Sequence, residues 1–187
     1  MPLATRSIAI CGAPLVGKRE LLTRLAEAAD CHHLVNEELS SGERIVRLRL
    51  VRSELARSRK ARLSPWESPV DEIDVRLVSG AMFFEVPVIE TVLNGAHMIV
   101  YVIATGEAGP DQDFQYSYFR MYKREAQRSL LPNAPWIWVL NKVDMGSTNP
   151  LEHHIPDEKR PSVIDTVAIT GVGIEAVWKR IDDLLVI

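Results

Sequence analysis

The stretch GAPLVGK, residues 12–18, decides the fold of this chain. It has the spacing GxxxxGK, in which a glycine-rich turn ends in a lysine. Glycines let backbone N–H groups point inward around a phosphate, and the N-terminus of a following helix adds positive partial charge. The apolar run Ser7–Cys11 before the turn predicts a buried strand, and residues 18–29 carry apolar side chains at helical spacing. The turn therefore has the strand–turn–helix context that a phosphate-binding loop requires.

This loop supplies the candidate phosphate-binding residues. Lys18 is placed to reach the terminal phosphates of a nucleotide. An ordinary glycine-capped turn with a surface lysine would have the same pattern, so the loop needs support from other segments. The candidates are Gly12, Ala13, Pro14, Leu15, Val16, Gly17, Lys18 and Arg19.

A second segment, NKVD at residues 141–144, follows the apolar run WIWVL and so falls on the ligand-facing edge of an α/β sheet. The Asp144 carboxylate can accept both the ring N1–H and the exocyclic amine of guanine, a pair of bonds that adenine cannot match. Asn141 can donate to purine N7, and the Lys142 stem can lie over the base. Taken alone, NKVD is also compatible with a polar turn that contains an N-capping aspartate.

A third segment, TVAITGVGI at residues 166–174, lies at the end of the last predicted strand. A backbone N–H near Ala168 could donate to guanine O6 there, with Ile169 beside it. Three segments in this order, each at a strand end, predict a nucleotide site. Its candidate guanine-binding residues are Asn141, Lys142, Asp144, Ala168 and Ile169.

Short apolar runs alternate with amphipathic stretches along the rest of the chain, which is typical of a layered α/β domain. The run 44–52 alternates apolar residues with arginine, which predicts a half-exposed antiparallel edge strand that pairs with the next strand. The polar interval 31–43 is expected to be loop. The further predicted strands are 71–80, 97–104, 136–141 and 162–169, and the further predicted helices are 83–96, 112–131 and 174–187.

Composition limits the cellular setting. The 187 residues are 47% hydrophobic, carry a net charge of −3 and include two cysteines. The charge argues against a general nucleic-acid binder, and the cysteines imply no disulfide framework. We find no signal peptide, and the longest apolar stretch, 98–104, is too short to span a bilayer. We therefore expect a cytoplasmic protein without a transmembrane segment.

On these motifs the chain resembles Ras-like small GTPases and is most similar to the bacterial MglA-like group of gliding motility and polarity. DEIDVRLVSGAMFFEVP (71–87) and LNGAHMIVYVIA (93–104) resemble that group from its third to its fourth strand, and AITGVGIEAV (168–177) resembles its guanine-contacting segment. The resemblance implies a single three-layer P-loop NTPase G domain over residues 1–187. It also implies GTP or GDP binding and a switch that works through a regulatory or effector protein. In the family, such partners include roadblock/longin-type regulators.

The chain departs from the family where Mg²⁺ and hydrolysis depend on it. Arg19 stands where the family has a Ser or Thr that binds Mg²⁺, and arginine has no acceptor atom. Leu77 replaces the aspartate of the DxxG signature, and Ala81 replaces the water-positioning glutamine. Residues 25–89 contain no threonine, so the switch threonine is missing, and Ser40 or Ser41 is a weak substitute. Mg²⁺ is thus a doubtful cofactor, and intrinsic GTP hydrolysis is expected to be weak or absent.

Several alternatives stay open. Arg19 could pair directly with phosphate oxygens, or it could be a solvent-facing helix residue. No catalytic residue is assigned. The chain could also be a nucleotide-free pseudo-GTPase scaffold, or an active GTPase whose catalytic group comes from a partner.

Two further features of the sequence suggest possible binding sites, one for a charged partner and one for a metal. Eight basic residues between positions 44 and 62 could recognise an acidic partner, membrane headgroups or nucleic acid, or supply a cis arginine finger. A solvated edge-strand face is the favoured interpretation, with peripheral membrane contact left open. The pairs His32-His33 and His153-His154 match no metal-ligand spacing, so no metal site is predicted. The interval 145–161 suggests a reduced or irregular fourth helix and an altered surface.

Overall fold

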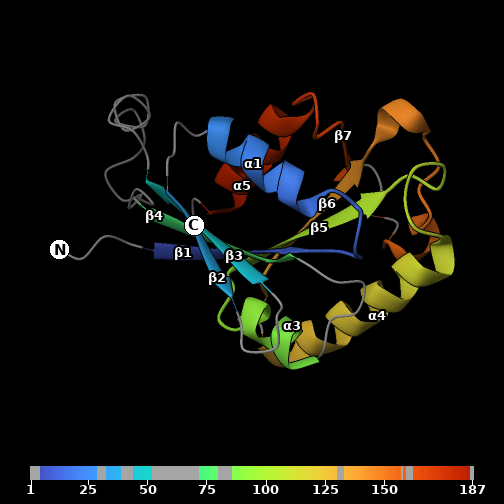
Figure 1. Cartoon of the computed structure of the whole chain (residues 1–187). Helices are drawn as coiled ribbons and strands as arrows, with labels where there is room; N and C mark the ends of the chain where they lie inside the picture. Colours follow the sequence, from blue (N-terminus) through green and yellow to red (C-terminus); the bar gives the residue numbers. More distant parts are fainter. Residues whose placement is uncertain are drawn as a thin grey trace.

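The computed structural model describes residues 5–28, 33–38, 44–51, 72–79, 86–129, 133–156, 158 and 162–185. Within them, seven strands form one sheet in the order β2-β3-β4-β1-β5-β6-β7 (Figure 1). The strands are β1 Thr5–Cys11, β2 His33–Glu38, β3 Arg44–Val51, β4 Glu72–Ser79, β5 Met98–Ala104, β6 Trp136–Asn141 and β7 Ile164–Thr166. The α-helices are α1 Lys18–Ala28, α3 Val86–Leu93, α4 Gln112–Ser129 and α5 Ile174–Leu185, and the 3-10 helices are η1 Val143–Met145 and η2 Glu152–His154.

Strand directions confirm the predicted α/β class and correct one detail. β4, β1, β5, β6 and β7 run parallel, and β3 pairs antiparallel with β4, as predicted for residues 44–52 and 71–80. Residues 33–38, which were expected to be loop, form β2 and pair antiparallel with β3. The sheet therefore has two antiparallel pairings at this end, in which β3 runs opposite to the other described strands, and β2, not β3 as predicted, forms the edge. The prediction of loop was wrong because HLVNEE has only two strongly apolar residues, and backbone pairing decides its structure.

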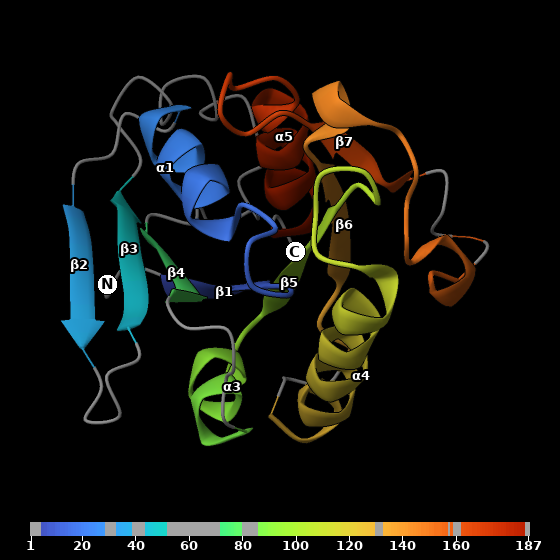
Figure 2. The same ribbon diagram turned by 45° about the vertical axis from the view of Figure 1, so that its right-hand side comes forward.

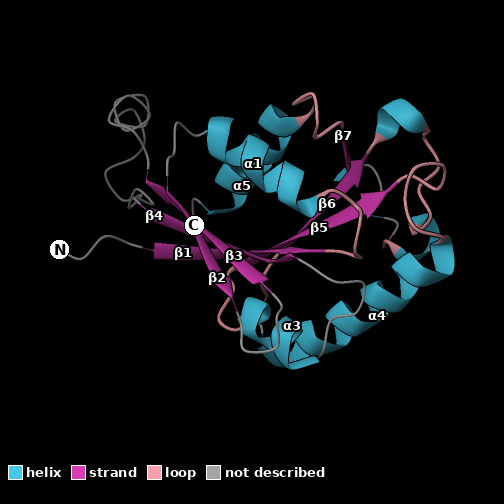
Figure 3. Cartoon of the chain, in the orientation of Figure 1, coloured by secondary structure: helices cyan, strands magenta, loops and turns pink. Residues whose placement is uncertain are grey.

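The helices cover both faces of the sheet. Figures 1 and 3 show α1 and α5 on one face and α3 and α4 on the other. Strand β5 lies inside the sheet between β1 and β6, and every residue from Met98 to Ala104 is buried. A strand that is covered on both faces needs apolar side chains on both, which explains the unbroken apolar run there.

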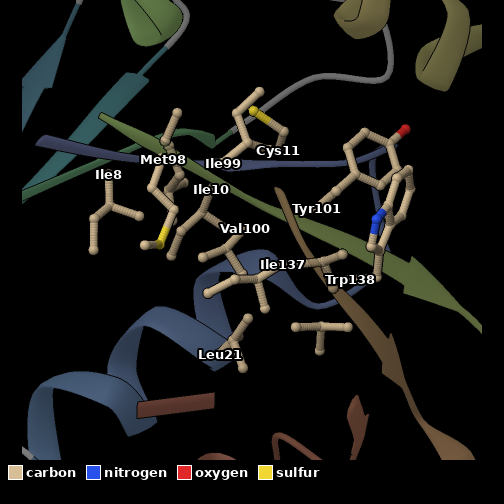
Figure 4. Close-up of a cluster of buried hydrophobic side chains, with 14 of the residues drawn as sticks. Ile8, Ile10, Cys11, Leu21, Met98, Ile99, Val100, Tyr101, Ile137 and Trp138 are labelled. Atoms are coloured by element: carbon tan, nitrogen blue, oxygen red, sulfur yellow. The ribbon is translucent and has the colours of Figure 1, made fainter. Parts of the chain in front are cut away.

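The core has one layer of side chains on each side of the sheet (Figure 4). Leu21 of α1 approaches Ile10 and Val100, which are register partners on β1 and β5. Cys11 and Tyr101 form the next register pair and point to the opposite face, where Tyr101 packs edge-on against Phe119 of α4 at 5.7 Å between ring centroids. Burial of each such large apolar side chain contributes about 1.5–3 kcal/mol.

The register also aligns the strand ends. Ala104 of β5 pairs with Asn141 of β6, and Asn141 pairs with Thr166 of β7. The connections that leave β1, β5, β6 and β7 therefore meet at one edge of the sheet, as Figure 2 shows. All the predicted site segments lie there. Among the described residues, none of the helices has the length and apolar character needed to cross a bilayer.

Candidate nucleotide-binding site

The turn between β1 and α1 is built around two glycines that no other residue could replace without strain. Gly12 has φ +139° and Gly17 has φ +92°, both in the region that favours glycine. A Cβ at Gly12 would collide with the carbonyl oxygen of Val102, and one at Gly17 would collide with the Asn141 side-chain amide. The turn therefore packs tightly against β5 and β6.

Two non-glycine residues of this edge also adopt positive φ. Leu15, at the tip of the turn, has φ +64°, and Lys142, just after β6, has φ +65°. Such conformations are rare for bulky residues and cluster at functional sites, where the surrounding structure holds them in place. Strained backbone conformations thus occur in two of the three segments that the sequence predicted to form the nucleotide site.

Lys18, the first residue of α1, lies inside the turn. Its side chain is 6% exposed, and Nζ donates to the carbonyl oxygens of Gly12 at 2.9 Å and Ala13 at 2.7 Å. Burial lowers the pKa of Lys18 to about 7, and burial raises the pKa of the neighbouring Cys11 thiol. A negatively charged ligand at the turn would restore the charged form of the lysine.

Arg19 and Leu77 stand where Ras-like proteins have groups that bind or support Mg²⁺, and neither side chain can ligate a metal. Arg19 is exposed on α1, and its guanidinium has no hydrogen bond or ion pair with the described residues. Leu77 is fully buried in β4, where it is the register partner of Ile10. The residues present therefore do not fit a magnesium site of the Ras type. Ala81, Ser40 and Ser41 lie outside the described residues.

Asn141 joins the three predicted segments. It ends β6, is 2% exposed, and donates from Nδ2 to the carbonyl oxygen of Val16 at 2.9 Å. Its Oδ1 accepts from Thr166 Oγ1 at 3.1 Å and from the Ala168 N–H at 2.9 Å. One buried amide thus connects the turn after β1 with the loop after β7.

These bonds define which donors the site still offers. A side-chain amide has two N–H groups, so Asn141 keeps one after bonding Val16. The N–H of Ala168, expected to face a ligand, donates to Asn141 instead. The N–H of the next residue, Ile169, has no partner among the described residues. Ile169 is therefore the better placed backbone donor of this loop.

The NKVD turn is fixed by the connection between β5 and α4. Lys142 Nζ donates to the carbonyl oxygen of Ala108 at 2.9 Å, which lays the lysine stem along that connection. Thr105 Oγ1 donates to the Lys142 carbonyl oxygen at 3.4 Å. Asp144 follows in η1, and its side chain is exposed. Lys18 and Asp144 lie at the same edge of the sheet, as the nucleotide hypothesis requires.

Two further contacts hold that connection in place. The buried Gln115 of α4 accepts from the Ala104 N–H at 3.0 Å and donates to the carbonyl oxygens of Ala104 and Pro110. Thr148 Oγ1 donates to Glu107 Oε1 at 2.5 Å, and this bond is the main cause of the lowered pKa of Glu107. The connection between β5 and α4, which contacts the NKVD turn, is thus held by hydrogen bonds to Gln115 and to Thr148.

Arg24 of α1 was not predicted to belong to the site, yet it supports the loop after β7. Its Nε donates to the Ala168 carbonyl oxygen at 3.2 Å, and Nη2 donates to the Ile169 carbonyl oxygen at 2.6 Å. Nη1 donates to Glu27 Oε2 at 2.8 Å in an ion pair that is open to solvent. The sequence offered only a helix arginine among other charged residues, so it held no specific signal for this contact.

The site edge also exposes apolar surface. In the described part of the chain, the exposed large apolar side chains are Leu15, Met145, Ile169 and Val172, each 58–73% exposed. All four belong to the loops of this edge. Apolar side chains beside buried polar donors are the usual composition of a small-molecule site.

Comparison with known proteins supports the fold. No protein-family model matches the chain, and no curated protein matches its sequence. Among solved structures, the G domain of the FeoB iron transporter of T. maritima matches with a TM-score of 0.57 and 12% identity. The match covers 97% of this chain and 99% of that chain. The chain therefore has the α/β P-loop NTPase fold of a G domain, as its sequence predicted.

Proposed function

We propose that this chain is a guanine-nucleotide-binding regulatory protein of small-GTPase type that acts as a switch through partner proteins. The observation that carries the proposal is the Asn141 amide, which bonds both Val16 in the phosphate loop and Ala168 in the last loop. A buried amide with these two bonds would hold the loop for the phosphates and the loop for the base at a fixed distance from each other.

The proposed roles follow from the donors and acceptors at the edge. Lys18 and the N–H groups of residues 12–18 would hold the phosphates of GTP or GDP. Asp144 would accept the two guanine donors, and the second N–H of Asn141 would reach N7. The Ile169 N–H, or Ala168 if it releases Asn141, would donate to O6. The stem of Lys142 and the exposed apolar side chains would cover the faces of the base.

Hydrolysis is proposed to be weak or absent. Enzymatic phosphoryl transfer in P-loop proteins depends on Mg²⁺ and a positioned water. Arg19 and Leu77 occupy the positions where the family places metal-binding or metal-supporting groups. Arg19 is exposed at the start of α1, so its guanidinium could reach phosphate oxygens and supply part of the missing positive charge.

The finer assignment rests on sequence resemblance. From the resemblance of segments 71–87, 93–104 and 168–177, we propose that the chain is most similar to the MglA-like group and that a roadblock/longin-type protein regulates it. We propose one G domain over residues 1–187 and a cytoplasmic location. The basic segment 44–62 lies mostly outside the described residues, and its membrane, partner or arginine-finger roles stay proposals.

A nucleotide-free scaffold is the second candidate, and one contact favours it. Lys18 Nζ donates to two carbonyl oxygens of its own turn, so the loop is internally bonded without any ligand. In a scaffold these bonds would be the whole role of the lysine, whereas in a nucleotide-binding protein the ammonium, which has three N–H donors, would also donate to a phosphate oxygen.

Denaturing the purified protein and chromatographing the released small molecules separates the two candidates. Bound GDP or GTP supports the proposed function, whereas a nucleotide-free protein that also ignores micromolar GDP supports the scaffold. Repeating the titration with EDTA tests the metal argument. We expect nearly unchanged affinity on chelation, and a large loss would show that Mg²⁺ is held after all.

A further inference from the structure

A cavity of about 340 Å³ opens between α4, β6 and α5, near the amino-terminal end of β6 and away from the nucleotide site. Nothing in the proposed nucleotide function uses it. We call it the tryptophan groove and define it by Phe119, Lys123, Trp136, Trp138, His154 and Arg180, which all line it.

The floor of the groove is aromatic. Trp136 and Trp138 stack with centroids 5.4 Å apart and rings 29° from parallel, and Phe119 lies 5.7 Å from Trp138. Trp138 and Phe119 are buried, but Trp136 is only half-buried. Large aromatic side chains that stay partly open to the surface are enriched at protein–protein interfaces.

The described residues between β6 and β7 form little regular structure that could cover the floor. They form two three-residue 3-10 helices, η1 and η2, in keeping with the reduced fourth helix that the sequence suggested. His154 of η2, which lines the groove, stacks on Tyr116 with ring centroids 3.9 Å apart, and Trp136 stays half-buried. His154 was considered as a metal ligand from sequence, and it serves here as a stacking ring.

The rim of the groove is basic. Lys123 and Arg180 line it, and the part of its lining that the structure describes contains no acidic side chain. Lys123 Nζ lies 5.7 Å from the centroid of Phe119, so the cation sits beside the aromatic floor. The whole chain has a net charge of −3, so this positive region is a local feature.

The basic character extends beyond the groove. A second hollow of about 720 Å³ lies over α4, shares Phe119, Lys123 and His154 with the groove, and adds Arg120 and Arg124. Its one carboxylate, Glu125, is buried, with ion-pair distances of 3.8 Å to Arg124 and Arg128. An aromatic floor with several cationic side chains around it complements a negatively charged peptide segment that carries apolar side chains.

We propose that the tryptophan groove binds an acidic segment of a partner protein, which places an aromatic or aliphatic side chain on Trp136 and Trp138. Its carboxylates would face Lys123 and Arg180 and continue toward Arg120 and Arg124 on α4. A partner segment fits better than a small ligand because the two hollows share Phe119, Lys123 and His154 and so lie next to each other. The inference is independent of nucleotide binding.

Selection of a random peptide-display library against the full-length protein tests the proposal. We expect the enriched peptides to be rich in Asp and Glu and to carry an aromatic or large aliphatic residue. Their affinity should fall with added salt. Arg180→Glu and Lys123→Glu should each weaken binding about tenfold or more, because each places like charges together. Lys179→Glu, a neighbouring exposed position outside the lining, is the matched control and should change little.

Peptide binding by the Trp136→Ala variant is a second test of the proposal. Thermal unfolding verifies that each variant stays folded. The substitution should abolish binding of the enriched peptides, and titration of the wild type with them should change tryptophan emission. The proposal is overturned by peptides without acidic bias, by equal binding to Arg180→Glu and Lys179→Glu, or by no enrichment. Concentration-dependent self-association that Lys123→Glu removes would assign the groove to a second copy and also overturn it.

Discussion

The side-chain amide of Asn141 donates to the backbone carbonyl of Val16 at 2.9 Å across 125 residues of sequence. This bond joins the last residue of β6 to the turn after β1. Because Asn141 also accepts from Ala168 N–H, a displacement of any one of these loops disturbs the other two. The geometry of the candidate site therefore depends on one buried side chain.

Replacement of Asn141 by Ala should destabilise the protein and loosen the site. The carbonyl of Val16, the hydroxyl of Thr166 and the N–H of Ala168 would lose their shared partner, and we expect a cost of about 3 kcal/mol in unfolding free energy. Chemical denaturation measures this, with Asn94→Ala, at an exposed position after α3, as the control. A loss equal to that of the control would mean that the network is dispensable.

Asp144→Ala should abolish the preference for guanine while the fold is kept, because the exposed Asp144 carboxylate supports no described contact. Competition between GTP and ATP for the binding site measures the effect. Asp183→Ala, at an exposed position on α5, is the control and should keep full selectivity. Unchanged GTP-over-ATP selectivity in Asp144→Ala would place the base-reading group elsewhere.

Burial of Lys18 makes the stability of the nucleotide-free protein depend on pH. The lysine has a pKa of about 7 in the folded protein against an ordinary value of 10.5, so above pH 7 the unfolded chain binds the extra proton. Unfolding free energy should then rise with pH between 7 and 9, relative to Lys18→Met. Above pH 9 the buried Cys11 thiol acts in the opposite sense, since its ordinary pKa of 9.0 is raised by burial.

Denaturation of wild type and Lys18→Met at several pH values measures this difference. Bound phosphate should restore the charged lysine, so GDP affinity should fall as pH rises above 7, by at most about tenfold per unit. A difference in unfolding free energy that does not change between pH 7 and 9 would show that the lysine is charged within the empty loop.

Arg24→Ala should accelerate the release of bound nucleotide, because the carbonyls of Ala168 and Ile169 lose their charged donors and the loop after β7 loosens. Stopped-flow displacement of a fluorescent GDP analogue gives the rate. Glu27→Gln, which removes only an exposed ion pair, should have a small effect. Equal release rates in the two variants would show that Arg24 does not control nucleotide release through the loop after β7.

The sequence predicted those parts of the fold that depend on local pattern. Met98–Ala104 is an unbroken apolar run and forms a fully buried strand inside the sheet, and the glycines of the phosphate loop stand where positive φ and close approach require them. Strand β2 was missed because HLVNEE has no clear alternation, and its structure comes from backbone pairing with β3.

Long-range contacts explain the rest of what the sequence could not show. Arg24 reaches a loop 144 residues away, and no periodicity or motif announces such a contact. The tryptophan groove is hidden for a related reason. Trp136 and Trp138 lie two residues apart on one strand, a spacing that any strand has, and we attribute the partial exposure of Trp136 to the short 3-10 helices described between β6 and β7. The Ala168 N–H donates to Asn141, so among the described residues it is the N–H of Ile169 that has no partner in this pair.

Titration of nucleotide-stripped protein with fluorescent GDP, in competition with unlabelled GDP, GTP and ATP, tests the central claim most directly. The convergence of Lys18, Asn141 and Asp144 at one sheet edge predicts saturable micromolar or tighter binding that GDP and GTP reverse and ATP does not. Absence of binding at micromolar GDP, or equal displacement by ATP, would contradict the guanine-nucleotide site and leave only the fold.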